Sequence, residues 1–181
     1  MTAKEYMKVV AADTAYSYEN IDTDAMEKMC DEIMAAKRIF ITGAGRSLLV
    51  MRAFAMTLMQ IGFDTRVVGD VTTPAARPGD LLIAGSFSGT TKTTRMHLEC
   101  ARKFGLRFAL WTAHKSSPMA DEADVAVVVP CPTGEGRETV QWGGYDYEHA
   151  LFPLCDILVW MLCDRLGIDE AGKNANHANI E

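Results

Sequence analysis

The chain has 181 residues, 49% of them apolar and 23% charged, which fits one soluble globular domain and is too short for two ordinary ones. Its formal net charge of -6 argues against a nucleic acid as the main partner, and no apolar run is long enough for a membrane span or resembles the hydrophobic region of a signal peptide. We therefore expect a single cytoplasmic domain over residues 1–181, with neither a nucleic acid nor a membrane as partner.

Apolar periodicity predicts helices that alternate with short apolar strands. The helices place apolar residues three and four positions apart, whereas the strands are brief apolar runs bounded by glycine or by charged residues. In chain order we expect helices at about 3–18 and 22–37, a strand at 38–45, a helix at 47–62, strands at 64–69 and 79–86, a helix at 90–105, a strand at 107–112, a short helical turn at 118–123, a strand at 124–130, a looser stretch at 132–144 and a long helix at 146–167.

Several residues mark where these helices should begin and end. Asp22 or Thr23 is the expected N-cap of the second helix, because a short polar side chain there accepts a bond from the first free amides. Gly62 and Gly105 are expected to close the two helices that precede them. Pro153 is expected near the first turn of the last helix, where a missing N–H does least harm.

The strands are apolar throughout rather than alternating, which indicates a parallel sheet covered on both faces. We expect an α/β fold with a doubly wound, flavodoxin-like sheet of about five parallel strands. Such sheets bind ligands beyond the carboxyl ends of their strands, near the point where the strand order reverses. The expected parts are N-terminal helices at about 3–37, a sheet core at about 38–130, and a C-terminal helix and tail at about 145–181.

The first candidate binding loop is TGAGRS, which follows the first strand and contains Gly45, Arg46 and Ser47. Glycines let the backbone approach a phosphate, and the start of a helix offers free N–H groups and a positive dipole end. The loop is half of a dinucleotide fingerprint, but the third glycine is replaced by Leu48 and no well-placed acidic residue follows the second strand. A tight strand-to-helix turn without ligand is the alternative.

The second candidate loop is GSFSGTT, which follows the third strand and carries Ser86, Ser88, Thr90 and Thr91. One hydroxyl is enough to cap a helix, so Ser88 or Thr90 as a plain N-cap is the structural alternative. Four hydroxyls at a helix start suit a phosphate, and the absence of GKS or GKT excludes an ATP-hydrolysing P-loop. Two such loops at adjacent strand ends fit one phosphate monoester better than a pyrophosphate.

These motifs resemble the sugar isomerase (SIS) domain family, and within it the 6-phospho-3-hexuloisomerases. The resemblance runs from about residue 20 to the C-terminus. It rests on GAGRS, FAMTLMQIGF, VVGDVTTPAARPGDLLIAGSFSGTT and ADVAVVVP with the later TVQ.

The resemblance implies that hydroxyls of both loops hold a sugar phosphate. In this sequence those hydroxyls are Ser47, Ser86, Ser88 and Thr91, while Phe87 stands where the family usually has glycine or glutamine. Arg46 matches the family's arginine, which either touches the ligand or forms a structural ion pair.

The resemblance also supplies a general base. The family motif Q-P-x-G-S-x-F-E corresponds here to QWGGYDYE, in which Gln141, Gly144 and Glu148 match and Tyr147 stands for phenylalanine. Glu148 inherits the role of moving a proton between adjacent carbons of the sugar, and the alternative is a glutamate that only stabilises the helix dipole. Trp142 and Tyr145 depart from the motif and add bulk to the expected sugar pocket.

The C-terminal NHANIE resembles the family ending R-H-A-N-L-E, which makes His177 a second candidate catalytic residue. His177 would assist ring opening or proton relay in a neighbouring subunit, and a frayed terminus is the alternative. His149 adjoins Glu148, but one step along a helix turns a side chain by about 100°, so the two are expected to diverge. The residues show no metal-ligand spacing, and the expected chemistry needs no metal or cofactor.

The expected function is therefore isomerisation of a sugar phosphate through an enediol, in a homo-oligomer that is a dimer or, as the family resemblance suggests, a tetramer. Three alternatives stay open: an isomerase of another sugar phosphate, a non-catalytic phosphosugar-binding module, and a dinucleotide-binding protein. Leu48 and the serine-rich second loop disfavour the dinucleotide-binding protein.

Overall fold

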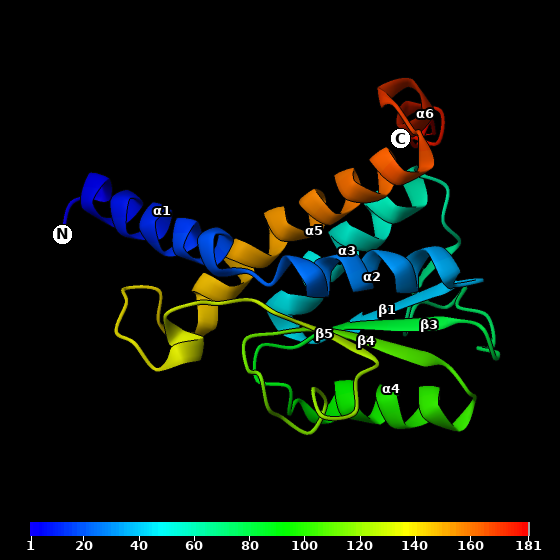
Figure 1. The fold of residues 1–181 in the computed structure, drawn as a ribbon, viewed down its shortest axis with the longest axis horizontal. Helices are drawn as coiled ribbons and strands as arrows, with labels where there is room; N and C mark the ends of the chain where they lie inside the picture. The colour runs from blue at the N-terminus through cyan, green and yellow to red at the C-terminus, as the bar shows by residue number, and fades with distance from the viewer. Residues whose placement is uncertain (181) are drawn as a thin grey trace.

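The computed structural model describes residues 1–180 and contains a five-stranded parallel sheet with helices on both faces (Figure 1). In chain order the elements are α1 (Ala3–Asn20), α2 (Thr23–Ala35), β1 (Ile39–Gly43), α3 (Gly45–Gln60), β2 (Thr65–Val67), β3 (Leu81–Gly85), α4 (Lys92–Lys103), β4 (Arg107–Thr112), β5 (Val125–Val128), η1 (Thr133–Glu135), η2 (Trp142–Gly144), α5 (Tyr145–Leu166) and α6 (Glu170–Asn174).

The strand order is β2-β1-β3-β4-β5, with every pairing parallel, so the predicted fold class is confirmed. The order reverses between β1 and β3, because the chain first adds β2 on one side of β1 and then places β3 on the other. Gly43 at the end of β1 pairs with Gly85 at the end of β3. The two glycine-bearing loops therefore leave the sheet side by side at the switch point.

The helices form two layers of unequal size. Figure 1 shows α2, α3 and α5 on one face of the sheet and α4 on the other. The larger core lies on the three-helix side and includes Phe54, Trp111 and Leu158, whereas Phe108 and Leu98 belong to a smaller core beneath α4. Strands buried on both faces are continuously apolar because each face packs against helices.

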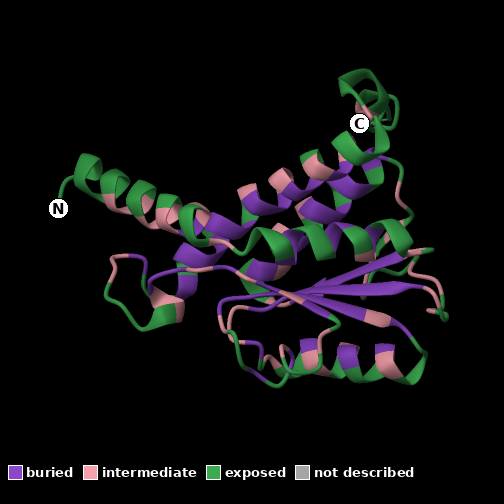
Figure 2. Ribbon diagram, in the orientation of Figure 1, coloured by how far each residue is buried: buried purple, intermediate pink, exposed green. Residues whose placement is uncertain are grey.

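The N-terminal helix α1 extends beyond the sheet and packs on the first part of α5 (Figures 1 and 2). Its capping box joins Thr2 and Glu5, so the helix begins with satisfied amides. Only Ser17 of this helix is fully buried, and Figure 2 shows its first turns largely exposed. The helix is therefore held by its last turns and by contacts near the start of α5.

Most predicted element boundaries are correct to within one or two residues, and Asp22 caps α2 by accepting from the amides of Asp24 and Ala25. The predicted turn of helix at 118–123 is present as an isolated hydrogen-bonded turn: the Asp121 amide donates to the Ser117 carbonyl at 2.9 Å, and Ser117 Oγ accepts from the Ala120 amide. The five-residue helix α6 was not expected at all.

Pro153 does not lie near the first turn as expected. It is inside α5, about two turns past the helix start. Gly144, with a φ of 85°, forms the N-cap of α5, so the helix begins at Tyr145, well ahead of the proline. The cost is one missing backbone bond, since Pro153 has no N–H to offer the carbonyl of His149. Among the described residues, no helix is long and apolar enough to cross a bilayer.

Candidate active site

The first loop joins β1 to α3 and leaves the start of that helix open. Ala44 is the N-cap and makes no side-chain capping bond, so the first amides of α3 have no side-chain acceptor from the cap. Gly45 has a φ of 55°, in the region that favours glycine. Ser47, in the first turn, is buried, and Arg46 is exposed. The loop has the form of an anion-binding helix start.

The second loop joins β3 to α4 and keeps its hydroxyls close to one another. Ser86 Oγ lies 3.3 Å from Thr91 Oγ1, and Ser88 Oγ lies 2.8 Å from Thr90 Oγ1. Thr91 is the N-cap of α4 and makes no side-chain capping bond. Ser88 Oγ accepts from the Thr90 amide at 3.2 Å, within the loop and ahead of the helix. Ser88 and Thr90 are therefore not the N-cap of α4.

The shape of this loop depends on Gly89, which has a φ of 62°. A Cβ at this position would lie 1.9 Å from Ser117 Oγ, so the space is already filled by the connection between β4 and β5. The loop hydroxyls are thus held in place by a close backbone approach as well as by their own hydrogen bonds.

Gly89→Ala is expected to destabilise the fold by about 2–3 kcal/mol, because strain at positive φ and overpacking against Ser117 add together. Gly62→Ala is the matched control, since Gly62 has a φ of 99° and open space where its Cβ would be. The control should lose only about 1 kcal/mol, the cost of the backbone conformation. Denaturant unfolding of both variants measures the difference, and equal losses would contradict the proposed clash.

Glu148 lies in the first turn of α5 and is directed at the first loop. Its Oε1 accepts from Ser47 Oγ at 2.8 Å, and its Oε2 accepts from Arg46 Nε at 3.1 Å. The Glu148 side chain is 10% exposed and that of Arg46 48% exposed. Both oxygens are thus bonded to α3, so the contacts of Glu148 go beyond those of a helix-dipole partner. Arg46 forms the ion pair that the sequence left as an alternative, and it does so inside the candidate site.

The start of α5 is anchored on three sides, which holds Glu148 in position. The buried Tyr147 hydroxyl donates to the Trp111 carbonyl at 2.9 Å, and burial raises its pKa well above the ordinary tyrosine value. Asp146 accepts from the Thr133 amide at 2.7 Å, which ties the helix to η1. A Cβ on Gly144 would lie 3.2 Å from the ring of Phe87, so this helix start also touches the second loop.

One aromatic side chain stands over Arg46, and a second stacks on the first. The guanidinium carbon of Arg46 lies 4.2 Å from the centre of the Tyr145 ring, and Trp142 stacks on Tyr145 with ring centres 6.4 Å apart. Trp142 and Tyr145 are two of the three positions that depart from the family motif, the third being Tyr147 in place of phenylalanine. They form an exposed wall beside the Arg46–Glu148 pair.

A cavity of about 530 Å³ opens beside the pair, between α1, α3 and α5. Glu148 bonds to the first loop and also lines this cavity, so it stands between the two. The second loop lies outside the lining. The lining residues are Val10, Thr14, Arg46, Leu49, Val50, Glu148, His149, Phe152 and Pro153.

His149 lines the same cavity as Glu148, while the two side chains bond to different partners, as their expected divergence implies. Its Nδ1 is hydrogen-bonded to Gln141 Oε1. Gln141 Nε2 in turn donates to Asp13 Oδ2 at 2.8 Å, and Thr139 Oγ1 donates to the same oxygen at 2.6 Å. Sequence reasoning missed this network, because Asp13 on α1 carries no motif and reaches Gln141 only through the fold.

The structure brings most of the predicted site residues together and leaves one apart. Gly45, Arg46, Ser47 and Glu148 meet directly at the starts of α3 and α5. The hydroxyls of the second loop lie at the adjacent strand end. His177 lies elsewhere: its neighbour Asn176 donates to the carbonyl of Gln60, at the opposite end of α3 from Ser47. That helix spans about 20 Å, so His177 does not reach Glu148 of its own chain.

Comparison with known proteins identifies the family and the fold. The SIS domain model matches residues 32–137. A Mycobacterium gastri protein named 3-hexulose-6-phosphate isomerase is 35% identical over 178 residues, which are 97% of this chain and 89% of the relative. A Bacillus subtilis protein of the same name is 31% identical over 185 residues and covers 100% of both chains.

A solved structure shares the whole architecture. It is a hypothetical protein of Methanococcus jannaschii, for which a molecular function of 3-hexulose-6-phosphate isomerase was inferred from the crystal structure. The TM-score is 0.87 at 27% sequence identity, with 98% of this chain and 99% of the other covered. A family match over most of the sheet core, relatives aligned over nearly the full length, and the two loops meeting at one switch point lead to one conclusion: the chain belongs to the SIS domain family.

Proposed function

We propose that the chain is a phosphosugar isomerase that interconverts 3-hexulose 6-phosphate and fructose 6-phosphate. The observation that carries the proposal is the Glu148 carboxylate, held by Ser47 and Arg46 beside an uncapped helix start. The names of the relatives from Mycobacterium gastri and Bacillus subtilis support the same substrate pair.

In this proposal the phosphate binds at the two loops. The open starts of α3 and α4 supply backbone N–H groups and the positive ends of two helix dipoles, and the serine and threonine hydroxyls supply further donors. The sugar carbons extend from the phosphate past Glu148 toward the cavity. Arg46 then exchanges its bond with Glu148 for an oxygen of the ligand, which frees one carboxylate oxygen to act as a base.

Glu148 takes a proton from one carbon of the open-chain sugar and returns it to the next. The intermediate is an enediol, and the carboxylate needs to reach both carbons from one side. A coupled assay over a panel of sugar phosphates tests the activity, with fructose 6-phosphate and NAD compared by thermal shift. Stabilisation by NAD alone would contradict the proposal and favour a dinucleotide-binding protein. Binding of sugar phosphates without turnover of any of them would contradict it too and favour a phosphosugar sensor.

A second substrate is favoured by one observation, the Trp142–Tyr145 wall over Arg46. Tyr145 lies against the guanidinium of Arg46, which bonds to Glu148, so bulk here would restrict how Arg46 meets the ligand and would select a different ketose or aldose phosphate. Tyr145→Ser restores the residue of the family motif. Improved turnover of 3-hexulose 6-phosphate by this variant, together with weak activity of the parent, would favour the second substrate.

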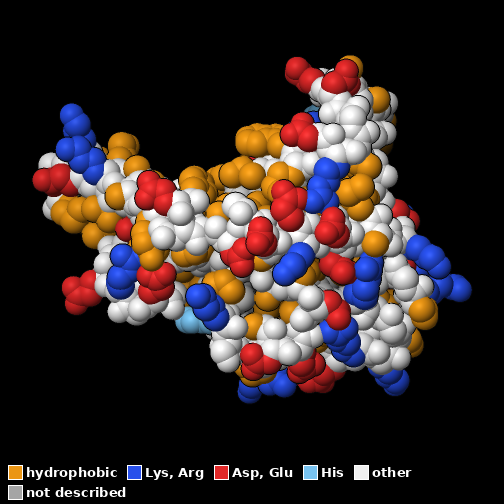
Figure 3. Space-filling model, viewed as in Figure 1, with side chains coloured by type: hydrophobic (Ala, Val, Ile, Leu, Met, Phe, Trp, Pro, Cys, Tyr) orange, Lys and Arg blue, Asp and Glu red, His pale blue; other side chains and the backbone are white. Residues whose placement is uncertain are grey.

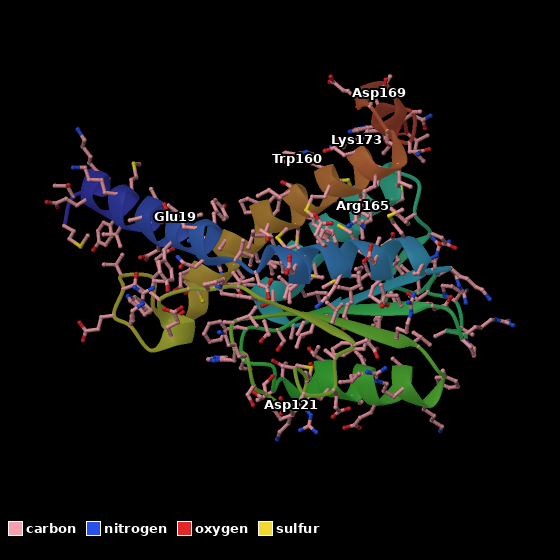
Figure 4. The ribbon with its side chains drawn as sticks, viewed as in Figure 1. Glu19, Asp121, Trp160, Arg165, Asp169 and Lys173 are labelled. Carbon is pink, nitrogen blue, oxygen red and sulfur yellow. The ribbon has the colours of Figure 1, made fainter. Side chains whose placement is uncertain are left out.

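We also propose that the protein is a homo-oligomer, a dimer or a tetramer. Large apolar side chains are exposed on three neighbouring helices of one face: Tyr6, Met7, Leu49, Met56, Met59, Phe152 and Trp160. Figure 3 shows apolar side chains along α1 and above α5, and Figure 4 shows Trp160 projecting outward from α5. A second copy would cover this surface, and its tail would be free to bring His177 to the cavity.

Light scattering at micromolar concentration is expected to give a mass of at least two chains. Trp160→Glu should shift the protein toward monomer, because Trp160 is 62% exposed and a charge there would be buried unpaired at an interface. Val71→Glu is the control, since Val71 is fully exposed in the β2–β3 connection. A monomeric parent would contradict the assembly and, with it, the role of His177 across an interface.

We propose the cytoplasm as the compartment. The support is that all five cysteines, each in the described part of the chain, are free thiols, as reducing compartments maintain them.

A further inference from the structure

The proposed isomerisation moves a carbon-bound proton and also protons on two oxygens, and Glu148 accounts only for the carbon-bound proton. As Glu148 moves a proton from C2 to C3 of 3-hexulose 6-phosphate, the C3 carbonyl oxygen must gain a proton and the C2 hydroxyl must lose one. A second acid–base group near Glu148 would carry out this exchange. Histidine is suited to it, since its ordinary pKa lies close to neutral pH.

His149 is in the right place for that task. It lines the cavity together with Arg46 and Glu148, and its side chain is solvent-accessible. Among the hydrogen bonds of residues 1–180, those of His149 involve Nδ1 only, through Gln141 Oε1. The other ring nitrogen, Nε2, is therefore available to a ligand.

The network behind His149 determines which nitrogen carries the exchangeable proton. An ionised carboxylate only accepts hydrogen bonds, so the Gln141 atom bonded to Asp13 must be the amide nitrogen. The amide oxygen of Gln141 then faces His149 and must accept from Nδ1–H. Because Gln141 is buried and Thr139 also donates to Asp13, the amide is held in this orientation. Nδ1 keeps its proton throughout, and proton exchange is confined to Nε2.

We propose that His149 is the second acid–base residue of the isomerase, with Asp13 and Gln141 as the positioning residues that set its tautomer. The inference rests on the proposed function. The hydrogen bonds of these three residues connect α1, the segment before α5, and α5 itself.

The proton steps balance over one turnover. Protonated His149 donates its Nε2 proton to the C3 oxygen while Glu148 removes the proton from C2, and the C2–H electron pair becomes the double bond of the enediol. Neutral His149 then takes the proton of the C2 hydroxyl, the C2 carbonyl forms, and Glu148 returns its proton to C3. Both residues end in their starting states, and the cycle requires no oxidant, reductant or metal.

The test begins with the parent enzyme and the variant His149→Gln, which keeps a polar side chain but has no titratable group. We expect kcat to fall by about 10²–10⁴-fold with unchanged affinity for fructose 6-phosphate, and imidazole in the buffer to restore part of the activity. Asp164→Asn is the matched control. It removes an exposed charge near the far end of the same helix and should leave kcat unchanged.

Asp13→Asn tests the Asp13–Gln141–His149 network with a change of side chain that should leave the fold intact. An asparagine can donate as well as accept, so the Gln141 amide is no longer held in one orientation and His149 can lose its tautomer. We expect a lower kcat at an unchanged KM. Added to His149→Gln, this change should cause no further loss, because its effect passes through His149.

Two results would overturn the inference: His149→Gln with normal kcat, or a loss that imidazole does not rescue and that adds to the loss from Asp13→Asn. Failure of the proposed function is recognised separately, because the parent would then turn over no sugar phosphate, and that result would overturn both.

Discussion

Glu148→Gln is expected to lower the turnover of the sugar phosphate by at least about 10²–10⁴-fold, the usual contribution of a general base. Glutamine keeps the shape of the side chain and can still bond to Ser47, so the fold and the affinity for fructose 6-phosphate should change little. The lost ion pair with Arg46 is half-exposed on the arginine side and is worth at most about 1 kcal/mol. A lower kcat with retained binding marks a residue that acts on the transition state.

Isotope exchange separates this role from an electrostatic one. In deuterated water the parent should introduce deuterium at the reacting carbon, because a proton held on Glu148 exchanges with solvent, and the variant should not. Glu138→Gln is the control, since it removes an exposed carboxylate from the segment before α5. Near-normal turnover by Glu148→Gln on every sugar phosphate that binds would reduce Glu148 to a partner of Arg46 and of the helix dipole.

The second large effect is expected at the phosphate loops. Ser86→Ala or Ser88→Ala should weaken fructose 6-phosphate binding by about 1–3 kcal/mol, which corresponds to about 5- to 150-fold in Kd. Binding depends on these hydroxyls because neither loop contains a lysine and Arg46 is paired with Glu148 in the free protein, so short donors and helix starts supply most of the bonds to the phosphate. Isothermal titration measures the change, with Ser116→Ala, an exposed hydroxyl outside the two loops, as the control.

The two serines should differ in their effect on folding. Removing a hydroxyl from a surface loop should leave the free energy of unfolding almost unchanged, and we expect this for Ser88→Ala. Ser86 is buried and lies 3.3 Å from Thr91 Oγ1, so its loss should also cost about 1 kcal/mol of unfolding free energy. Unchanged Kd in both variants would contradict the phosphate site.

The sheet and its switch point were predictable because their signals are local. A run such as Leu81–Gly85 is apolar at every position before its terminal glycine, and that pattern in so short a run is typical of a strand covered on both faces. The cap at Asp22 is equally local, since its side chain bonds to amides two and three residues ahead. The position of both loops, at the ends of two adjacent strands, was predictable for the same reason.

The partners of these residues were not predictable, because they depend on distant packing. The sequence pointed to Glu148 by its motif, but not to the bonds that its two oxygens make with α3. Gln141 and Asp13 are 128 positions apart, and no periodicity connects them. The position of Pro153 was predicted wrongly, because the preference of proline for the first turn reflects the intrinsic stability of a helix. In this fold, tertiary contacts keep α5 continuous although the backbone hydrogen bond at Pro153 is missing.

The extended position of α1 has a consequence for local stability within a protomer. Opening this helix exposes little buried surface, because only Ser17 is fully covered, whereas opening α5 would expose much of the larger core. The amides of α1 should therefore exchange with deuterated solvent through a low-energy partial opening, well below the free energy of global unfolding. Each opening separates Asp13 from Gln141. On warming, activity should decline in step with this fraying, at temperatures where the sheet is still fully protected from exchange.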